Sequence, residues 1–410
     1  MKKFKLVAYL LVVVMLFAAC TPAAQTPSDS PPAATPDAPP AAPGTPPGDE
    51  PGTAAAENPN IPDYNYVFPH GTVFDINTYY NSIDPLLDCD VTIRQTGGTV
   101  EVPDNMTTPM PQANERFTVG FSVYYTVDEV GAMILDTMVD AAAEAGINLL
   151  THDANYDQNA QNVAIEQWIL QGVDGVILAP CDFYGVRDAL ERLEAAGIPA
   201  ITLNAPLAGS ADSIVFAECS DQGRLAAEML INHLNAQGTP ISGKIIINNI
   251  SFLHPNAVLR EKGFMDAFAG YPDVEFIVLS ALSPEEHYIA FEGALLAHPD
   301  MIGAYGIYSS ATIGMMNAKL ANNSTVPITS IDNDKIILAG IYDGNLVGSA
   351  CYSSIAPSWW AMTLMVNQLN GVTIPGMIWY ENRAVTRDNV EAMFEHYYPG
   401  QTLAGFMAGQ

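Results

Sequence analysis

The chain has 410 residues, of which 15 are Lys or Arg and 45 are Asp or Glu, so its formal net charge is −30. These cations are too few to neutralise a phosphate backbone, which excludes nucleic acid as a partner. At about 100–200 residues per domain, the length allows two domains with cores of their own.

The first 20 residues have the pattern of a secretory signal. Three lysines precede an apolar run over 6–18 that is too short to span a bilayer, and small residues lead to Cys20. Ala18-Ala19-Cys20 resembles the cleavage site of lipoproteins, in which the cysteine is acylated and becomes the new N-terminus. The sequence therefore predicts an extracytoplasmic protein, at the cell surface or in the periplasm, held on the cell membrane by lipid on Cys20. The alternative is an uncleaved signal anchor.

Two further segments precede the main body. Residues 21–60 contain 12 prolines and no Lys or Arg, which is typical of a disordered Pro/Ala-rich tether. Residues 61–115 mix aromatic residues with Asp, Asn and Gly without a clear period. We expect an N-terminal extension of unknown role there, β-rich or irregular and packed on the main domain.

From residue 117 the chain alternates apolar strand patterns with helical ones. Strands are predicted at 117–123, 147–152, 175–180, 198–204, 244–250, 274–280, 301–308 and 326–332. A helical stripe follows the first strand and stops at Gly146, and comparable helical patterns follow most of the others. Strands that are apolar throughout and separated by helices indicate parallel sheets covered on both faces. The predicted fold class is α/β, with two doubly wound, Rossmann-like lobes.

The residues just after these strands are candidate ligand-binding residues, because ligands of doubly wound sheets bind at the carboxyl ends of the strands. These positions hold polar or aromatic residues: Tyr124, Tyr125, Asp128, Asn204, His254, Asn256, Arg260, Tyr308, Asp332 and Tyr352. No GxGxxG, GxxxxGKS/T or GxSxG motif is present, so neither a phosphate cradle nor a nucleophile elbow is predicted. Carboxylates, amides and a guanidinium pair with sugar hydroxyls, and tyrosine faces cover the C–H face of a sugar ring. The set therefore favours a neutral polyhydroxy ligand.

Structural roles are the alternatives for several of these residues. Asp332 could cap the helix that follows it, and His254 could cap or pack. The tyrosines could be core or rim aromatics, while Trp168 and Trp360 fit core positions.

Four cysteines remain besides Cys20, namely Cys89, Cys181, Cys219 and Cys351. The even number allows two disulfides, but the spacings contain no CxxC or metal-ligand pattern. In a body with a large core of its own, buried free thiols are the favoured interpretation.

Over about 116–397 the chain resembles the type I periplasmic sugar-binding proteins, the ribose- and galactose-binding family. The segment HPNAVLR at 254–260 is similar to the HPDAEAR-type segment of galactose-binding members. This similarity implies sugar-contact roles for His254, Asn256 and Arg260.

Other strand ends match the family in part. Asp128, Asn204 and Asp332 stand where the family has Asp or Asn. Tyr308 and Tyr352 stand where Asn, Asp or Gln is usual, so the resemblance implies the fold and the polyol chemistry but not the identity of the sugar.

The resemblance also implies domain boundaries and a hinge of three strands between the lobes. Beyond the signal at 1–20, the tether at 21–60 and the extension at 61–115, the two-lobed domain spans 116–400. Lobe 1 is expected at about 116–218 and 353–378, and lobe 2 at about 222–351 and 380–400, with crossings near 218–221, 352–354 and 377–381.

The implied function is that of a solute-binding protein, which captures a monosaccharide of the pentose or hexose type between its lobes and hands it to the permease subunits of an ABC transporter. The resemblance implies a monomer without enzymatic activity, cofactor or metal, and the galactose-type calcium loop is not evident. One alternative is a sensor that presents its ligand-loaded surface to a chemoreceptor or histidine kinase. Another is a glycoside-processing enzyme with Asp128 and Asp332 as its acid pair, against which we expect fixed hydrogen-bond donors to keep both acids ionised.

Overall fold

A computed structural model of the chain describes residues 91–95, 99–106, 108–182, 184–203, 209–250 and 254–409. The predicted signal with Cys20, the tether, the extension up to residue 90 with Cys89, and Asn204 lie outside the described residues. All described residues belong to one unit, Thr53–Gln410. Within the described ranges, no helix is both long and apolar enough to cross a membrane.

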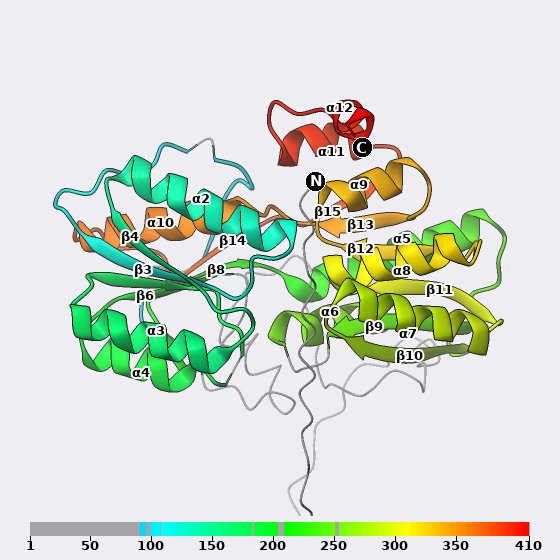
Figure 1. Cartoon of the computed structure of the whole chain (residues 1–410), viewed down its shortest axis with the longest axis horizontal. Helices are drawn as coiled ribbons and strands as arrows, with labels where there is room; N and C mark the ends of the chain where they lie inside the picture. The colour runs from blue at the N-terminus through cyan, green and yellow to red at the C-terminus, as the bar shows by residue number, and fades with distance from the viewer. Residues whose placement is uncertain are drawn as a thin grey trace, which may run out of the picture. The chain divides into compact units, whose positions relative to one another are not determined.

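Lobe 1 is built on a seven-stranded parallel sheet (Figure 1). Its strands, in spatial order, are β2 (Thr99–Glu101), β14 (Met377–Tyr380), β8 (Ser213–Ala217), β6 (Ala200–Leu203), β5 (Gly175–Leu178), β3 (Thr118–Val123) and β4 (Asn148–Asp153). Helices α2 (Glu129–Ala145) and α10 (Ala356–Leu369) pack together on one face, and α3 (Gln158–Gln171) and α4 (Arg187–Ala195) pack together on the other.

Lobe 2 is built on a six-stranded sheet, of which only the last strand pair is antiparallel. Its strands, in spatial order, are β10 (Val274–Ala281), β9 (Gly243–Ile250), β11 (Met301–Gly306), β12 (Ile328–Ile331), β13 (Gly348–Cys351) and β15 (Arg383–Thr386). Its helices are α5 (Cys219–Ala236), α6 (Pro255–Asp266), α7 (Pro284–Ala297), α8 (Ser309–Ala321), α9 (Lys335–Tyr342), α11 (Val390–Tyr397) and α12 (Leu403–Ala408). The predicted α/β class with two doubly wound lobes is confirmed.

The apolar strand patterns arise because helices cover both faces of each sheet. In β9, Ile245 and Ile247 lie in one core cluster with residues of α5 and α6. Ile246 points to the opposite face and lies in a second cluster with residues of α7 and α8. Since consecutive strand side chains alternate between faces, a strand covered on both sides is apolar at most of its positions.

Three connections join the lobes. The first lies between β8 and α5 at Glu218, the second between β13 and α10, and the third between β14 and β15 at Glu381 and Asn382. The first and third are bonded to each other, since Asn382 Nδ2 donates to Glu218 O at 2.8 Å and Asn382 Oδ1 accepts from Gln222 Nε2 at 3.1 Å.

The described part of the extension adds short strands and caps lobe 1. β1 (Val91–Ile93) pairs with β7 (Gly209–Ala211), and β2 pairs with β14. The indole N–H groups of Trp359 and Trp360 donate to Thr108 O and Pro103 O, each at 3.0 Å. The extension therefore covers the start of α10, where it buries both tryptophans.

Helices α5 and α6 touch at two glycines. A Cβ added to Gly263 would lie 1.9 Å from Ser220 O, and one added to Gly223 would lie 2.0 Å from Arg260 O. Both neighbours are backbone atoms, which no change of side-chain rotamer can move away. These glycines set how closely α6, which carries candidate site residues, approaches α5.

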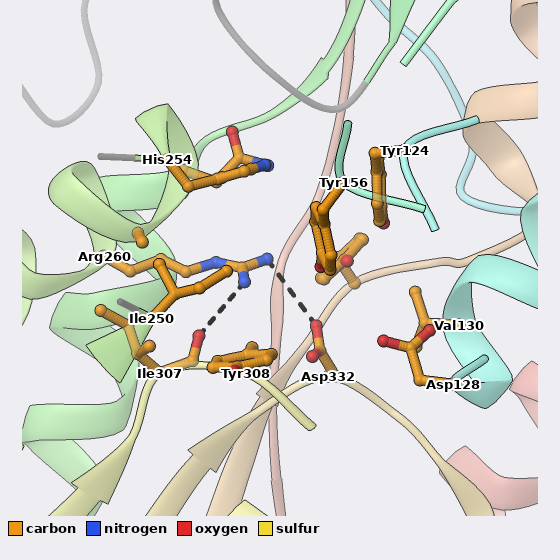
Figure 2. A pocket seen from close by; sticks show the side chains of 13 residues that line it. Tyr124, Asp128, Val130, Tyr156, Ile250, His254, Arg260, Ile307, Tyr308 and Asp332 are labelled. Carbon is orange, nitrogen blue, oxygen red and sulfur yellow. Dashed lines mark hydrogen bonds and ion pairs between the residues drawn. The ribbon is translucent and has the colours of Figure 1, made fainter. Parts of the chain in front are cut away.

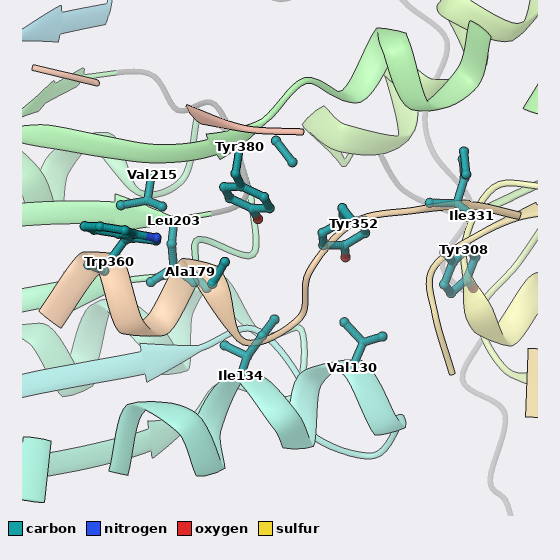
Figure 3. Close-up of a cluster of buried hydrophobic side chains, with 14 of the residues drawn as sticks. Val130, Ile134, Ala179, Leu203, Val215, Tyr308, Ile331, Tyr352, Trp360 and Tyr380 are labelled. Atoms are coloured by element: carbon teal, nitrogen blue, oxygen red, sulfur yellow. The ribbon is translucent and has the colours of Figure 1, made fainter. Parts of the chain in front are cut away.

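A continuous cluster of buried side chains runs from lobe 1 into lobe 2. Figure 3 shows Tyr352 and Tyr380 between Leu203 and Val215 of lobe 1 and Ile331 of lobe 2. Trp168 and Trp360 are buried as predicted, and the three described cysteines, Cys181, Cys219 and Cys351, are buried and free.

Candidate ligand-binding site

A pocket lies between the lobes at the carboxyl ends of their strands (Figure 2). It encloses about 490 Å³ that protein atoms do not fill, the opening to solvent included. Lobe 1 supplies Tyr124, Asp128, Val130 and Tyr156, and lobe 2 supplies Ile250, His254, Asn256, Ala257, Arg260, Ile307, Tyr308, Asp332 and Tyr352. The pocket is therefore lined by residues of both lobes.

Eight of the ten residues predicted at the site line this pocket. They are Tyr124, Asp128, His254, Asn256, Arg260, Tyr308, Asp332 and Tyr352. Of the other two, Asn204 is outside the described residues, and Tyr125 does not line the pocket. The ring of Tyr125 stacks instead on that of Tyr156, with centroids 4.8 Å apart.

Tyr156 is a pocket residue that the sequence analysis missed. Asn155 and Tyr156 both have positive φ, 47° and 58°, so the chain folds back sharply after β4. This turn places the Tyr156 ring against that of Tyr124, with centroids 5.8 Å apart and planes 17° apart. Its place after a strand end was the signal that could have identified it.

Arg260 on α6 is held by three partners and is only 6% exposed. Its Nε donates to Gln222 Oε1 at 2.7 Å, its Nη1 donates to Ile307 O at 3.2 Å, and its Nη2 lies 3.7 Å from Asp332 Oδ1. Burial alone would lower the pKa of Arg260, but Asp332 together with Tyr352, Cys219 and Tyr305 outweighs burial and raises it. The guanidinium is therefore a fixed, permanent positive charge, and its centre lies 5.5 Å from the centroid of the Tyr352 ring.

Asp332 follows β12 and faces both Arg260 and the start of α8. Its Oδ2 accepts from the backbone N–H of Ser309 at 2.8 Å and from Ser309 Oγ at 3.0 Å, while its Oδ1 has no hydrogen-bond partner. Its φ is 75°, a left-handed conformation that Asp tolerates better than most residues. Asp332 thus caps a neighbouring helix, whereas Asp334 takes the N-cap position of the helix that follows.

Asp128 is the N-cap of α2, and its Oδ1 accepts from Gly131 N at 2.7 Å. Burial raises the pKa of Asp128 to about 6, the hydrogen bond from Gly131 opposes that rise, and the charge of Asp332 adds to it. The fixed donor therefore does not hold the pKa of Asp128 at its ordinary value, although most of the carboxyl is still ionised at pH 7. One backbone donor does not compensate for the loss of water around its carboxylate.

His254 forms part of an aromatic wall of the pocket. It is the N-cap of α6 but makes no side-chain capping bond, and its ring meets those of Tyr124 and Tyr156 edge-on. Burial, followed by the charge of Arg260, lowers the pKa of His254 to about 3. The imidazole is therefore neutral at physiological pH.

The hydroxyl of Tyr308 is fixed from behind the pocket. Tyr308 Oη donates to Leu282 O at 2.9 Å and lies 2.7 Å from Nε2 of the buried His287. Burial lowers the pKa of His287 to about 4, so this histidine is neutral and its Nε2–H donates to Tyr308. The ring of Tyr308 therefore has a defined orientation at the pocket wall.

An ion pair bridges the lobes at the rim of the pocket. Glu129, the first residue of α2, accepts from Lys335 Nζ and from the Lys335 backbone N–H, both at 2.8 Å. Lys335 is the first residue of α9, so the pair joins lobe 1 directly to lobe 2. The lobes are thus in contact around the pocket in this structure.

A second pocket lies beside the third connection and is lined by Glu101, Val102, Pro103, Asp104, Asn105, Glu381, Arg383 and His396. Asp104 accepts there from Arg383 Nε at 2.8 Å and lies 3.0 Å from His396 Nε2. Burial would raise the pKa of Asp104, but His396 and Arg383 outweigh burial and lower it to about 2. Within the described ranges, no group of three or more His, Cys, Asp or Glu side chains is placed to hold a metal ion.

Comparisons with known proteins match the lobed body of the chain. The ribose import binding protein of Bacillus subtilis is 22% identical over 250 residues, which cover 60% of this chain and 79% of that protein. The xylitol-binding protein of Mycolicibacterium smegmatis is 24% identical over 268 residues, or 63% of this chain and 74% of that protein.

Solved structures match the same region. A solute-binding protein of an ABC transporter from Mycobacterium smegmatis, with bound glycerol, has a TM-score of 0.64 and 25% identity over 68% of this chain and 97% of that chain. One from Bacillus halodurans, with bound myo-inositol, has a TM-score of 0.64 at 22% identity over 71% of this chain and all of that chain. The family model for the periplasmic binding protein domain matches residues 119–373, more than half of the chain. The chain therefore belongs to the periplasmic binding protein family, as the residues at its strand ends implied.

Proposed function

We propose that the protein captures a monosaccharide, or a polyol of similar size, between its two lobes and delivers it to the permease of an ABC importer. The observation that carries this proposal is the Arg260–Asp332 pair in a pocket lined from both lobes. A guanidinium has five N–H donors, of which Gln222 and Ile307 take two. Its remaining N–H groups can donate to hydroxyl oxygens of a ligand, and Oδ1 of Asp332, which accepts no hydrogen bond in the structure, can accept from a ligand hydroxyl.

Because both lobes line the pocket, the structure is consistent with capture of a ligand by closure of the two lobes on it. A ligand that touches Asp128 on lobe 1 and Arg260 on lobe 2 does so only when the lobes are together. Its binding energy therefore favours the closed arrangement, which the Glu129–Lys335 pair also stabilises. In this proposal the protein binds without chemical conversion, and one chain suffices because its own two lobes complete the site.

Relatives support the ligand class. They include proteins named for the import of ribose and of D-apiose and for the binding of xylitol. All three ligands are small and rich in hydroxyl groups, which fits the polar and tyrosine-rich lining of this pocket.

A ligand panel tests the proposal. Pentoses, hexoses, their 2-amino forms, xylitol and myo-inositol are screened by thermal shift, and each hit is measured by calorimetry. A ligand at 100 times its Kd should stabilise the protein by about 2.7 kcal/mol. If no sugar, amino sugar or polyol of the panel raises the melting temperature, the proposed function is wrong.

We also propose that lipid on Cys20 anchors the protein outside the cytoplasm. Cys20 follows a short apolar run and small residues, and one acyl chain holds a protein only marginally whereas two hold it stably. The Cys20→Ser variant should move from the membrane fraction to the soluble fraction or the medium. Cys89→Ser is the matched control and should stay with the membrane; retention of both variants would contradict the anchor.

A further inference from the structure

The charges that line the pocket do not balance. Its lining holds two carboxylates, Asp128 and Asp332, and one cation, Arg260. The gaps in the described region, at 96–98, 107, 183, 204–208 and 251–253, contain no Lys or Arg, and none occurs between Lys5 and Arg94. Neither these gaps nor residues 6–90 can therefore supply a second Lys or Arg.

Arg260 in the pocket and Lys335, which bridges the lobes, already have carboxylate partners. Arg260 pairs with Asp332, and Lys335 at the rim pairs with Glu129. Asp128 forms no ion pair with any Lys or Arg in the part of the chain that the structure describes, and its one hydrogen bond there comes from Gly131 N. The carboxylate of Asp128 thus faces the pocket without a counter-ion.

Three acceptor atoms on residues that line the pocket have no hydrogen-bond partner in the part of the chain that the structure describes. Asp332 Oδ1 and Asn256 Oδ1 are buried without a hydrogen-bond partner, in side chains of residues that are 4% and 7% exposed. The second oxygen of Asp128 has no partner among the described residues. Unpaired buried acceptors are costly, so a ligand that donates hydrogen bonds to these atoms is stabilised at this site.

We propose that the pocket selects a monosaccharide or polyol that carries an ammonium group, and that Asp128 is the counter-ion of that group. This inference rests on the proposed function and narrows its ligand class. An ammonium supplies three N–H donors together with the missing positive charge, whereas a hydroxyl supplies one donor and no charge.

Affinity for an amine should depend on pH in a defined direction. Protonation of Asp128, whose pKa is about 6, competes with ammonium binding, so affinity should fall about tenfold between pH 7 and pH 5. The charged and titratable groups around Asp128 are Asp332, Asp334, Arg260, Glu129, Lys335, His254, Tyr124, Tyr125, Tyr156, Tyr308 and Tyr352. Of these, His254 and the five tyrosines stay neutral over this range, because their pKa values lie far outside it.

Asp334 also has a raised pKa, from burial and from the charge of Asp332. It hydrogen-bonds to Ser309 and does not line the pocket. An Asp128→Asn variant distinguishes the contributions of the two acids to the pH dependence of binding. It removes the titration of Asp128 and leaves that of Asp334 in place.

The test compares D-glucosamine, D-galactosamine and D-mannosamine with D-glucose, D-galactose and D-mannose by calorimetry on the full chain at pH 7. At least one amine should bind more tightly than its parent, by about tenfold or more. Asp128→Asn should remove most of the difference in affinity between the amine and its parent sugar, and it should flatten the pH dependence of amine binding. The variant should fold, because Asn is as good an N-cap as Asp. Asp136→Asn, on the exposed face of α2, is the control. It makes the same change in net charge and should leave the difference in affinity between amine and parent sugar unchanged.

The outcomes distinguish this inference from the proposed function. A neutral sugar or polyol that binds more tightly than every amine would overturn the ammonium preference and leave the proposed function standing. An amine preference that survives Asp128→Asn would overturn the role of Asp128. If no sugar, polyol or amine binds, both the inference and the proposed function fail.

Discussion

Arg260→Ala should weaken ligand binding by about ten- to a hundredfold or more, because a hydrogen bond to a charged group contributes roughly 1.5–3 kcal/mol. It should also lower the melting temperature of the ligand-free protein. Arg260 is buried, and its removal leaves Gln222 Oε1, Ile307 O and the Asp332 carboxylate without their cation. Breaking a buried ion pair by removing one partner is strongly destabilising.

Two variants make this result specific. Arg260→Lys should recover little affinity, because an ammonium cannot donate to Gln222 and Ile307 in fixed directions while it faces Asp332. Arg192→Ala removes an Arg from the surface of α4, where its side chain is more than half exposed. This variant should change neither the ligand affinity nor the melting temperature of the ligand-free protein. Wild-type affinity in Arg260→Ala, measured by calorimetry, would show that the candidate site is misplaced.

Gly263→Ala should destabilise the protein by about 3 kcal/mol, at the upper end of the usual cost of overpacking. The new Cβ would lie 1.9 Å from Ser220 O, so α5 and α6 must move apart. Because α6 carries Asn256 and Arg260, we also expect ligand affinity to fall. Urea unfolding measures the first effect and calorimetry the second.

Gly293→Ala is the matched control for the glycine variant. Gly293 is exposed on α7 and has no atom within 4 Å of an added Cβ. The same substitution should stabilise the protein there by about 0.5–1 kcal/mol, because alanine favours the helix. If Gly263→Ala is as stable as wild type, the close approach of α5 and α6 is not required.

The candidate site was largely predictable because its residues occupy one kind of position. A residue that follows an apolar strand lies at the carboxyl edge of a sheet, and this rule places Tyr124, Arg260 and Asp332 near one another before any contact is known. Tyr156 follows the same rule but reaches the pocket through two successive left-handed residues. Such a turn has no hydrophobic period, so the pattern that revealed the strands did not reveal it.

The ionisation of Asp128 could not be predicted from its local sequence. Its capping bond to Gly131 is local, but its burial and the charge of Asp332 come from the lobe that packs opposite. The strands β8 and β14 were missed for a related reason. The two strands pair with each other across more than 150 positions of sequence, a contact that a local apolar pattern does not reveal.

The most direct test of ligand capture between the lobes is a crystal structure with the tightest-binding sugar or amino sugar of the panel. The account predicts that one ligand molecule touches Asp128 of lobe 1 and both Arg260 and Asp332 of lobe 2 at the same time. A ligand bound to one lobe alone, or bound outside this pocket, would contradict it.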